Sequence, residues 1–303
     1  MRIASGSAVT SRGRLAEGAR EYLLERGERL GDLFRIVETS FREAGARRVI
    51  PTTLIPLADI EDPDHAIVFT EAGTGRTLAL RQDLTPLVAR IVRQELAHLT
   101  SPYKLYYIER VWQSRSVGSR AREQIQAGCE WIGFGPERDG DVLALATTVA
   151  RQLTDRPLTL VLGDARLRAA WQAALTPADP RTAEAALDAR NLSLWQNAGD
   201  PAWPDLPLLT IDPGNVPPLP DGVRELVDEL VAVGRPLADQ VRVVIDPVAP
   251  APHDYYTGMW FQVLSGIEHD PWLRGGRYDQ RYENGRPAVG FAIDLDAVVE
   301  DCG

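Results

Sequence analysis

Polar and apolar side chains alternate between Gln124 and Trp131, a pattern that is typical of a β-strand. Gln124, Gln126 and Glu130 fall on one face of such a strand, while Cys129 and Trp131 fall on the other. A row of polar groups on a sheet face is either a solvated surface or part of a ligand site. Taken alone, the alternation favours the solvated surface, and it predicts that Cys129 is an inert core residue.

Three further segments carry groups that can do chemistry. Asp83 and Thr85 stand where a predicted strand ends and a helix begins, so either can cap that helix. The segments 253–258 and 275–279 contain tyrosines, each of which offers a stacking face and a hydroxyl group. The second segment starts with paired glycines before a predicted strand, where a ligand can approach the backbone closely. Each segment, taken singly, is also explained by an ordinary cap or turn.

The residue counts exclude several kinds of chemistry. Lys104 is the only lysine, so the chain has no Schiff-base lysine unless Lys104 is it, and Lys104 lacks the glycine-rich context of a Walker A lysine. The histidines are never three or four residues apart, and the two cysteines are too distant for a disulfide framework or a zinc site. We therefore expect no metal and no cofactor, and any chemistry must use arginine, carboxylate and backbone groups.

Length and charge limit the class of protein. The chain has 303 residues, a formal net charge of -10 and 44% hydrophobic residues, which is enough for a sizeable core. No apolar run is long enough to cross a membrane, and the first residues lack the apolar stretch of an export signal. The sequence thus predicts a cytoplasmic protein without membrane contact, and its acidity argues against a general nucleic-acid surface while leaving room for a local basic patch.

The periodicity of apolar residues predicts an α+β chain. Helical spacing predicts helices over 17–44, 84–96, 139–153, 164–175, 221–233 and 294–300. Branched and aromatic runs predict strands over 47–51, 77–81, 103–113, 124–134, 158–162, 241–245, 256–264 and 288–293. The strands 103–113 and 124–134 form an antiparallel hairpin with an arginine-rich tip. The proline-rich stretch 176–220 is predicted to be a small inserted subdomain or connection between the core segments 1–175 and 221–303.

In their order and spacing these segments resemble the catalytic core of class II histidyl-tRNA synthetases. The most specific elements are Asp254-Tyr255-Tyr256-Thr257-Gly258 and Gly275-Gly276-Arg277-Tyr278-Asp279, followed by Pro287-Ala288-Val289-Gly290-Phe291-Ala292. The resemblance spans about residues 15–175 and 240–300, with 45–51, 107–133 and 289–299 similar to the three class II motifs. It implies a class II aminoacyl-tRNA synthetase-like antiparallel sheet of six or more strands, flanked by helices, in a homodimer.

The resemblance also implies a set of histidine-binding residues, which in the family face the amino group and the imidazole. They are Asp83, Thr85, Gln126, Glu130, Tyr255, Tyr256 and Tyr278. For Glu130 the alternative is a buried charge that is paired with an arginine for structural reasons.

The chain departs from the synthetases where ATP chemistry needs arginine. The arginine of motif 2 falls on Trp112, that of motif 3 on Ala297, and the arginine that contacts the substrate carboxylate on Ala251, while a motif 3 glycine has become Asp294. Adenylate formation depends on neutralising the triphosphate, so these changes predict a protein that is not an enzyme and has no catalytic residues of its own. The chain also stops near the end of motif 3, which predicts that it has no anticodon-binding domain and does not bind tRNA.

This combination resembles the ATP phosphoribosyltransferase regulatory subunits, which are synthetase paralogues. The patterns Arg81-x-Asp83-x-Thr85-Pro86 and Arg120-x-Arg122-Glu123-x-x-Gln126-Ala127-Gly128 follow that family. The resemblance implies a non-catalytic subunit that binds a short catalytic subunit of ATP phosphoribosyltransferase and confers feedback inhibition by the effector L-histidine in the first step of histidine biosynthesis. Two alternatives stay open: a truncated histidine-activating synthetase, and a histidine-sensing paralogue with another partner.

Overall fold

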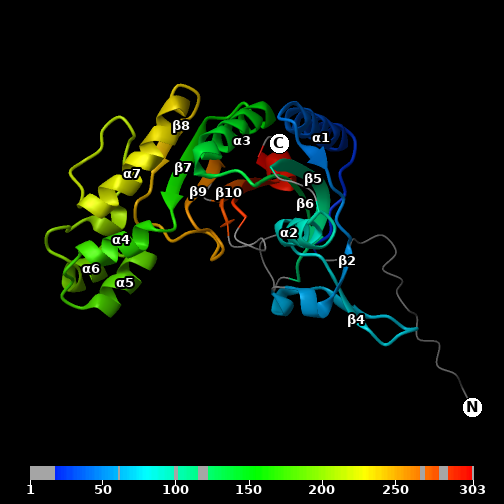
Figure 1. The fold of residues 1–303 in the computed structure, drawn as a ribbon, viewed down its shortest axis with the longest axis horizontal. Coiled ribbons are helices and arrows are strands. Elements are labelled where there is room, and N and C mark those ends of the chain that lie inside the picture. The colour runs from blue at the N-terminus through cyan, green and yellow to red at the C-terminus, as the bar shows by residue number, and fades with distance from the viewer. Residues whose placement is uncertain are drawn as a thin grey trace, which may run out of the picture.

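A mixed, mostly antiparallel sheet organises the chain (Figure 1). The computed structural model describes residues 18–60, 62–98, 102–114, 122–266, 270–279 and 286–301. Within these ranges the sheet has eight strands in the order β1-β5-β6-β11-β10-β9-β7-β8. The strands are β1 (Arg47–Arg48), β5 (Tyr103–Trp112), β6 (Glu123–Ile132), β7 (Leu158–Asp164), β8 (Arg242–Ile245), β9 (Met259–Ser265), β10 (Leu273–Arg277) and β11 (Ala288–Asp294). Only the outer pairs β1–β5 and β7–β8 are parallel, so the predicted α+β fold class is confirmed.

Three helices cover one face of the sheet. They are α1 (Glu25–Glu43), α3 (Asp139–Leu153) and α8 (Leu295–Asp301), which contact one another and the central strands. In α1 the buried positions Leu30, Leu33, Val37 and Phe41 recur at helical spacing, and Gly45, with φ of 82°, follows the helix. The apolar side of β6 faces these helices, where Cys129 is fully buried. Burial raises the pKa of the Cys129 thiol to about 12, as expected for an inert core residue.

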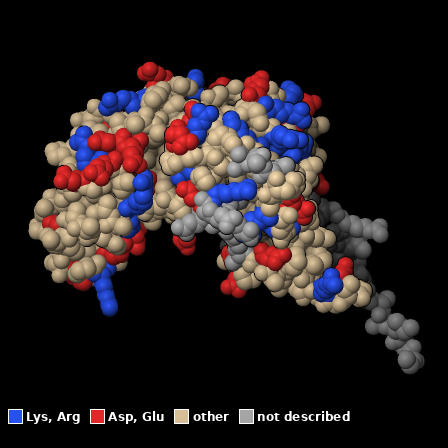
Figure 2. Space-filling view, viewed as in Figure 1, with Lys and Arg blue, Asp and Glu red and all other residues tan. Residues whose placement is uncertain are grey.

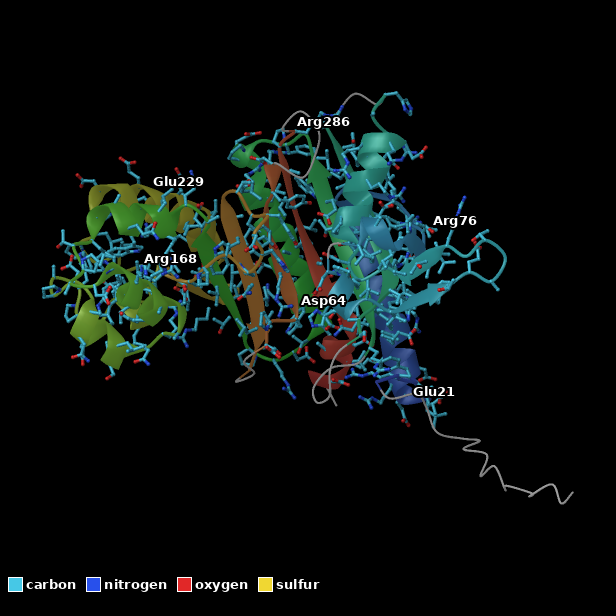
Figure 3. The ribbon with its side chains drawn as sticks, turned by 90° about the horizontal axis from the view of Figure 1, so that it is seen from below. Glu21, Asp64, Arg76, Arg168, Glu229 and Arg286 are labelled. Atoms are coloured by element: carbon cyan, nitrogen blue, oxygen red, sulfur yellow. The ribbon has the colours of Figure 1, made fainter. Side chains whose placement is uncertain are left out.

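The opposite face of the sheet is only partly covered. Helix α2 (Thr85–Gln94) packs there in a second core cluster with side chains of β5 and with Trp260 and Tyr278. Beside it lies a small antiparallel sheet of β2 (Leu54–Pro56), β4 (Thr77–Leu80) and β3 (Val68–Thr70), with 3-10 turns at Leu57–Asp59 and Pro63–His65. Figure 3 shows Arg76 near the outer end of this small sheet. The uncovered part of the face is where a ligand site can form.

A helical lobe extends from the β7–β8 edge (Figure 1). It contains α4 (Leu167–Ala174), α5 (Pro180–Asp188), α6 (Leu192–Ala198) and α7 (Asp221–Gly234), with 3-10 turns at Leu206–Leu208 and Arg235–Leu237. Its tryptophans pack inward: the rings of Trp171 and Trp203 lie 5.0 Å apart, and Trp171 donates to the Pro247 carbonyl. The lobe shares one apolar core with the sheet, and the predicted boundaries at 175 and 221 stay a prediction.

The surface of the helical lobe carries several of the acidic side chains that give the chain its negative net charge. Acidic side chains gather over α7 in Figure 2, where Glu225, Asp228 and Glu229 are exposed. Figure 3 shows Glu229 and Arg168 in this lobe, at the other end of the molecule from Arg76. No helix in the described part of the chain has both the length and the hydropathy needed to span a membrane.

The predicted start of the first helix was wrong. The apolar pattern placed Tyr22 and Leu23 in a helix over 17–44, but α1 starts at Glu25 because Leu24 has a φ of 51°. Leu23 is exposed, whereas the Tyr22 hydroxyl donates to Asp296 in α8. Long-range contacts therefore decide how the chain runs before the helix.

Two strand predictions also needed correction. The strand predicted over 47–51 is only Arg47–Arg48, since the chain leaves the sheet after Val49 donates to the Tyr106 carbonyl. Gly275 and Gly276 do not precede a strand: they lie inside β10, which the apolar pattern missed. A Cβ on Gly275 would come within 2.4 Å of the Phe261 ring, so glycine here allows aromatic packing. The arginine-rich hairpin tip, with Arg115 and Arg120, lies outside the described residues.

Arg277 serves the fold on the covered side of the sheet. Its guanidinium Nε lies 3.1 Å from both carboxylate oxygens of Asp139, at the start of α3, and Nη1 donates to the Phe134 carbonyl and to Asp279. Arg277 and Asp139 are 3% and 6% exposed. A buried ion pair with this many hydrogen bonds joins β10 to α3.

We predict that Arg277→Met lowers the free energy of unfolding by about 3–5 kcal/mol, because it leaves the Asp139 charge buried without its partner. Urea unfolding measures the change. The matched control is Arg224→Met, which removes an exposed i,i+4 pair with Asp228 and is expected to cost less than about 1 kcal/mol. Equal losses in the two variants would contradict a structural role for the buried pair.

Candidate functional site

One cavity lies against the uncovered face of the sheet. Its volume is about 380 Å³, and its walls come from β6, β11 and β10, from the start of α2 and from the segment 252–256. The structure brings together around it all seven residues that the sequence singled out. These are Asp83, Thr85, Gln126, Glu130, Tyr255, Tyr256 and Tyr278. The polar face of β6 is therefore the wall of a cavity, and the solvated-surface alternative does not apply.

Glycines make room for the floor of the cavity. Gly290 on β11 is paired with Glu130 on one side and Gly276 on the other. A Cβ at Gly290 would lie 2.0 Å from the Glu130 carboxylate, and one at Gly128 would lie 2.3 Å from the Tyr107 hydroxyl. Larger residues at these positions would therefore displace the polar side chains that line the cavity.

Glu130 is a buried carboxylate that accepts hydrogen bonds from hydroxyl groups. It is 1% exposed and accepts hydrogen bonds from Thr85 Oγ1 at 2.9 Å, from Tyr107 at 3.2 Å and from Tyr278. These partners differ from the arginine of the structural alternative. Burial raises the pKa of Glu130 to about 7, and the three hydroxyl donors limit that rise. The group is thus poised to accept a hydrogen bond from a ligand as well.

Asp83 and Gln126 form a second polar corner. Asp83 Oδ1 accepts from the backbone N–H of Leu84 at 2.7 Å and from Gln126 Nε2 at 3.1 Å, while Gln126 Oε1 accepts from Leu84 N–H at 3.1 Å. The predicted capping role of Asp83 or Thr85 was wrong, since the N-cap of α2 is Leu84 and no side chain caps it; Asp83 instead accepts from Thr85 N–H at the first residue of the helix. These bonds fix the carboxylate and the amide beside the cavity.

Aromatic rings form the remaining wall. Tyr255 stacks on His253 with the ring centroids 4.9 Å apart, and it contacts Tyr256 at 4.9 Å and Tyr278 edge-on at 6.1 Å. Burial raises the pKa of the Tyr256 hydroxyl, and the charges of Glu130 and Asp83 add to the rise. Tyr256 therefore stays a neutral hydrogen-bond donor. Two carboxylates beside neutral aromatic rings suit a small cationic or zwitterionic ligand with a flat ring.

Sequence reasoning missed three residues of the site. Tyr107 faces Glu130 across the hairpin, since the register pairs Tyr107 with Gly128, and that register was the available signal. His253 was noted only as part of a motif. Arg274 lines the cavity from β10, a strand that was itself not predicted. Its position two residues before Gly276 becomes informative only when β10 is known.

Comparisons with known proteins agree with this geometry. A family model described as Histidyl-tRNA synthetase matches residues 18–298. The ATP phosphoribosyltransferase regulatory subunit of Gloeobacter violaceus is 31% identical over 279 residues, which cover 85% of this chain and 70% of that protein. The chain belongs to this histidyl-tRNA synthetase-like family of regulatory subunits.

Other members of the regulatory-subunit family and its solved structures support the assignment. The ATP phosphoribosyltransferase regulatory subunit of Geobacter metallireducens is 29% identical and covers 94% of this chain and 73% of its own. A crystal structure of an ATP phosphoribosyltransferase regulatory subunit/histidyl-tRNA synthetase from Bacillus halodurans superposes with a TM-score of 0.77 at 21% identity, covering 94% of this chain and 82% of that one. That structure is similar in fold, including the central sheet.

The raised pKa of Glu130 predicts a pH-dependent stability. Its ordinary value is 4.5 and its folded value is about 7, so the folded state holds the proton more tightly than the unfolded state. The tighter proton binding by the folded state contributes fully to stability below pH 4.5, and this contribution is lost as the pH rises through about 7. We expect the wild-type unfolding free energy to fall relative to that of Glu130→Gln by about 3 kcal/mol between these limits.

Urea unfolding of both proteins at several pH values measures this difference, and the slope with pH separates titration from any constant cost of the amide. The exposed variant Glu229→Gln is the control and should follow the wild-type slope. Parallel curves for wild type and Glu130→Gln would show that Glu130 does not titrate in this range.

Proposed function

We propose that this protein is the non-catalytic regulatory subunit of an ATP phosphoribosyltransferase, acting in the first step of histidine biosynthesis and binding L-histidine as the feedback effector. The observation that carries the proposal is the enclosed Glu130, whose hydroxyl partners and tyrosine wall form a cavity suited to an amino acid with a flat ring. Membership of a family whose curated relatives are named regulatory subunits supports a regulatory use of that cavity.

Histidine complements the groups around the cavity. A neutral imidazole has one N–H donor and one nitrogen acceptor, which match the Glu130 carboxylate and a tyrosine hydroxyl. The ammonium group of the amino acid matches Asp83, which Gln126 and two backbone N–H groups hold in place. The ring has room to stack against Tyr255 or Tyr256. Each part of the ligand thus has a partner of opposite hydrogen-bonding or electrostatic character.

The positions at which synthetases use arginine support a non-catalytic role. Trp112 packs over Arg81, with the guanidinium carbon 5.8 Å from the ring centroid. Ala251 packs against the second core cluster, and Asp294 Oδ1 accepts from Ala297 N–H at the start of α8. The aromatic ring, the methyl group and the capping carboxylate cannot neutralise a triphosphate. We infer that the chain binds an amino acid without activating it.

Feedback inhibition then follows from linkage. Histidine inhibits the complex only if it binds an inactive arrangement more tightly than an active one. The cavity lies between α2 and the sheet, so a ligand contacts two elements at once. A shift of α2 against the sheet changes the distances between Thr85, Glu130 and the ligand, and this gives histidine different affinities for the two arrangements.

We further propose that the subunit forms homodimers and binds a short catalytic subunit. Ile50 is exposed in the segment 45–51, which resembles the class II dimer element, and Leu54, Val68 and Phe69 are exposed in the small sheet that follows. Exposed apolar residues gathered in one region are typical of an interaction surface.

The partner prediction has a direct test. A short ATP phosphoribosyltransferase subunit mixed with this protein should form one complex in size-exclusion chromatography with light scattering and gain phosphoribosyltransferase activity, while the protein alone should have the mass of a dimer. The protein alone should give no histidine-dependent exchange between ATP and pyrophosphate. Exchange activity would instead support the synthetase, and a failure to bind or stimulate the catalytic subunit would support a sensor with another partner.

Histidine sensitivity tests the cavity. We predict that Glu130→Gln raises the histidine concentration needed for half-inhibition by about 10- to 100-fold, because a hydrogen bond to a charged group contributes about 1.5–3 kcal/mol. Phosphoribosyltransferase assays of the complex and calorimetry of histidine binding measure this change. The control variant Glu225→Gln removes an exposed carboxylate of α7 and should keep the wild-type response. Unchanged inhibition in Glu130→Gln would place the effector site elsewhere.

A further inference from the structure

The cavity combines several acidic groups with one guanidinium. Asp83, Glu130 and Asp294 line it, and Arg274 is the only lysine or arginine among the lining residues that the structure describes. The wall segment 250–252 is Pro-Ala-Pro, which offers no side-chain donor. A zwitterionic amino acid needs a cation for its carboxylate as well as an anion for its ammonium group. Arg274 is the lining side chain with the chemistry to meet the first need.

The register of the sheet directs Arg274 toward the ligand. Arg274 and Gly276 are two residues apart on β10 and therefore share one face of the strand, the face that lines the cavity. Their Cα atoms are roughly 6.6 Å apart. On β11 the partner of Arg274 is Ala292 and the partner of Gly276 is Gly290. Because these residues have small or no side chains, little of the sheet rises above the backbone beside Arg274. A long side chain can therefore extend across it toward the cavity centre.

The Tyr256 hydroxyl is affected by the charges of both the acidic groups and the guanidinium. Burial is the main reason that the pKa of its hydroxyl is raised, and the charges of Glu130 and Asp83 act in the same direction. The Arg274 charge acts in the opposite direction. Arg274 and the carboxylate pair are thus both within electrostatic reach of one tyrosine. A ligand that stacks on this ring is therefore near both an anion and a cation.

We propose that Arg274 binds the α-carboxylate of the effector and so makes the cavity selective for the free amino acid. The inference rests on the proposed function, because it assumes that histidine occupies this cavity. Asp83 takes the ammonium group, Glu130 takes the imidazole, and the planar guanidinium takes both carboxylate oxygens. Analogues that keep the ring and the amine but lack the carboxylate leave Arg274 without its anionic ligand partner, and they bind weakly.

Calorimetry with L-histidine and with L-histidinol, in which a CH2OH group replaces the carboxylate, tests this role. Wild type should bind histidine about 10- to 100-fold more tightly than histidinol. Arg274→Met keeps an unbranched apolar side chain and removes the guanidinium, and it should weaken histidine binding by a similar factor. Histidinol, which is cationic, should bind the variant at least as tightly as it binds wild type, because the repelling guanidinium is gone. The preference between the two ligands should therefore disappear or reverse.

Two controls keep the result specific. Arg242→Met removes an exposed arginine from β8, at the far edge of the same sheet, and should leave both affinities unchanged. Arg274→Lys keeps the charge but cannot bind both carboxylate oxygens in the planar geometry, so it should restore part of the preference for histidine.

The outcomes separate this inference from the proposed function. If histidine binds wild type tightly and Arg274→Met equally tightly, Arg274 does not bind the carboxylate, while the proposed function stands. Equal affinity of wild type for histidine and histidinol overturns the inference in the same way, and it needs no variant to fold. If wild type binds neither ligand, the proposed effector site fails and the inference fails with it.

Discussion

The burial of one carboxylate at the centre of the sheet determines the arrangement around it. Removing the Glu130 charge from water is costly, and here hydroxyl donors offset part of that cost. The donors come from α2, from β5 and from the segment after β10, so the requirement joins three elements that are far apart in the chain. Gly290 is needed because any side chain there would occupy the position of the carboxylate. The fold and the site are thus fixed by the same set of contacts.

A second buried charge connects the site with the edge of the molecule. The Arg81 guanidinium is 2% exposed and donates to the carbonyls of Pro51 and Arg110 and to the Glu109 carboxylate. Two residues later, Asp83 accepts from the backbone N–H groups of Leu84 and Thr85 and faces the cavity. One short stretch of chain therefore contacts both the proposed ligand and the segment that follows β1. Packed and hydrogen-bonded contacts of this kind can carry coupling between two sites.

The sequence predicts what local pattern controls and misses what distant contacts control. The alternation over 124–131 predicted which residues share each face of β6, and the apolar spacing over 84–96 predicted α2 (Thr85–Gln94), because both depend on neighbours in sequence. The start of α1 was wrong because Tyr22 is held by Asp296, 274 residues away. Strand β10 was missed because its paired glycines, which sheet propensity disfavours, are required by the Phe261 and Tyr256 rings.

In the candidate site, too, local sequence predicts some residues and distant contacts determine the others. Its seven predicted residues came from motifs and do line one cavity, but no local pattern indicates that Tyr107 donates to Glu130. Arg274 could not be assigned before the register of β10 against β11 was known. Arg277, three residues further on, belongs to the motif 275–279, which was selected for its possible role in ligand binding. Its side chain nevertheless pairs with Asp139 and stabilises the fold.

The charges around the cavity separate binding from catalysis. Catalysis requires groups that stabilise charge appearing only in the transition state, which for adenylate formation means cations around phosphates. Three carboxylates and one described arginine give this cavity the opposite balance, so it favours a zwitterion over a polyanion. Regulation needs less: a ligand must only bind two arrangements of the protein with different affinities. The proposed contacts with Glu130, Asp83 and the tyrosines do not depend on ATP, so a synthetase-like sheet can bind an amino acid without activating it.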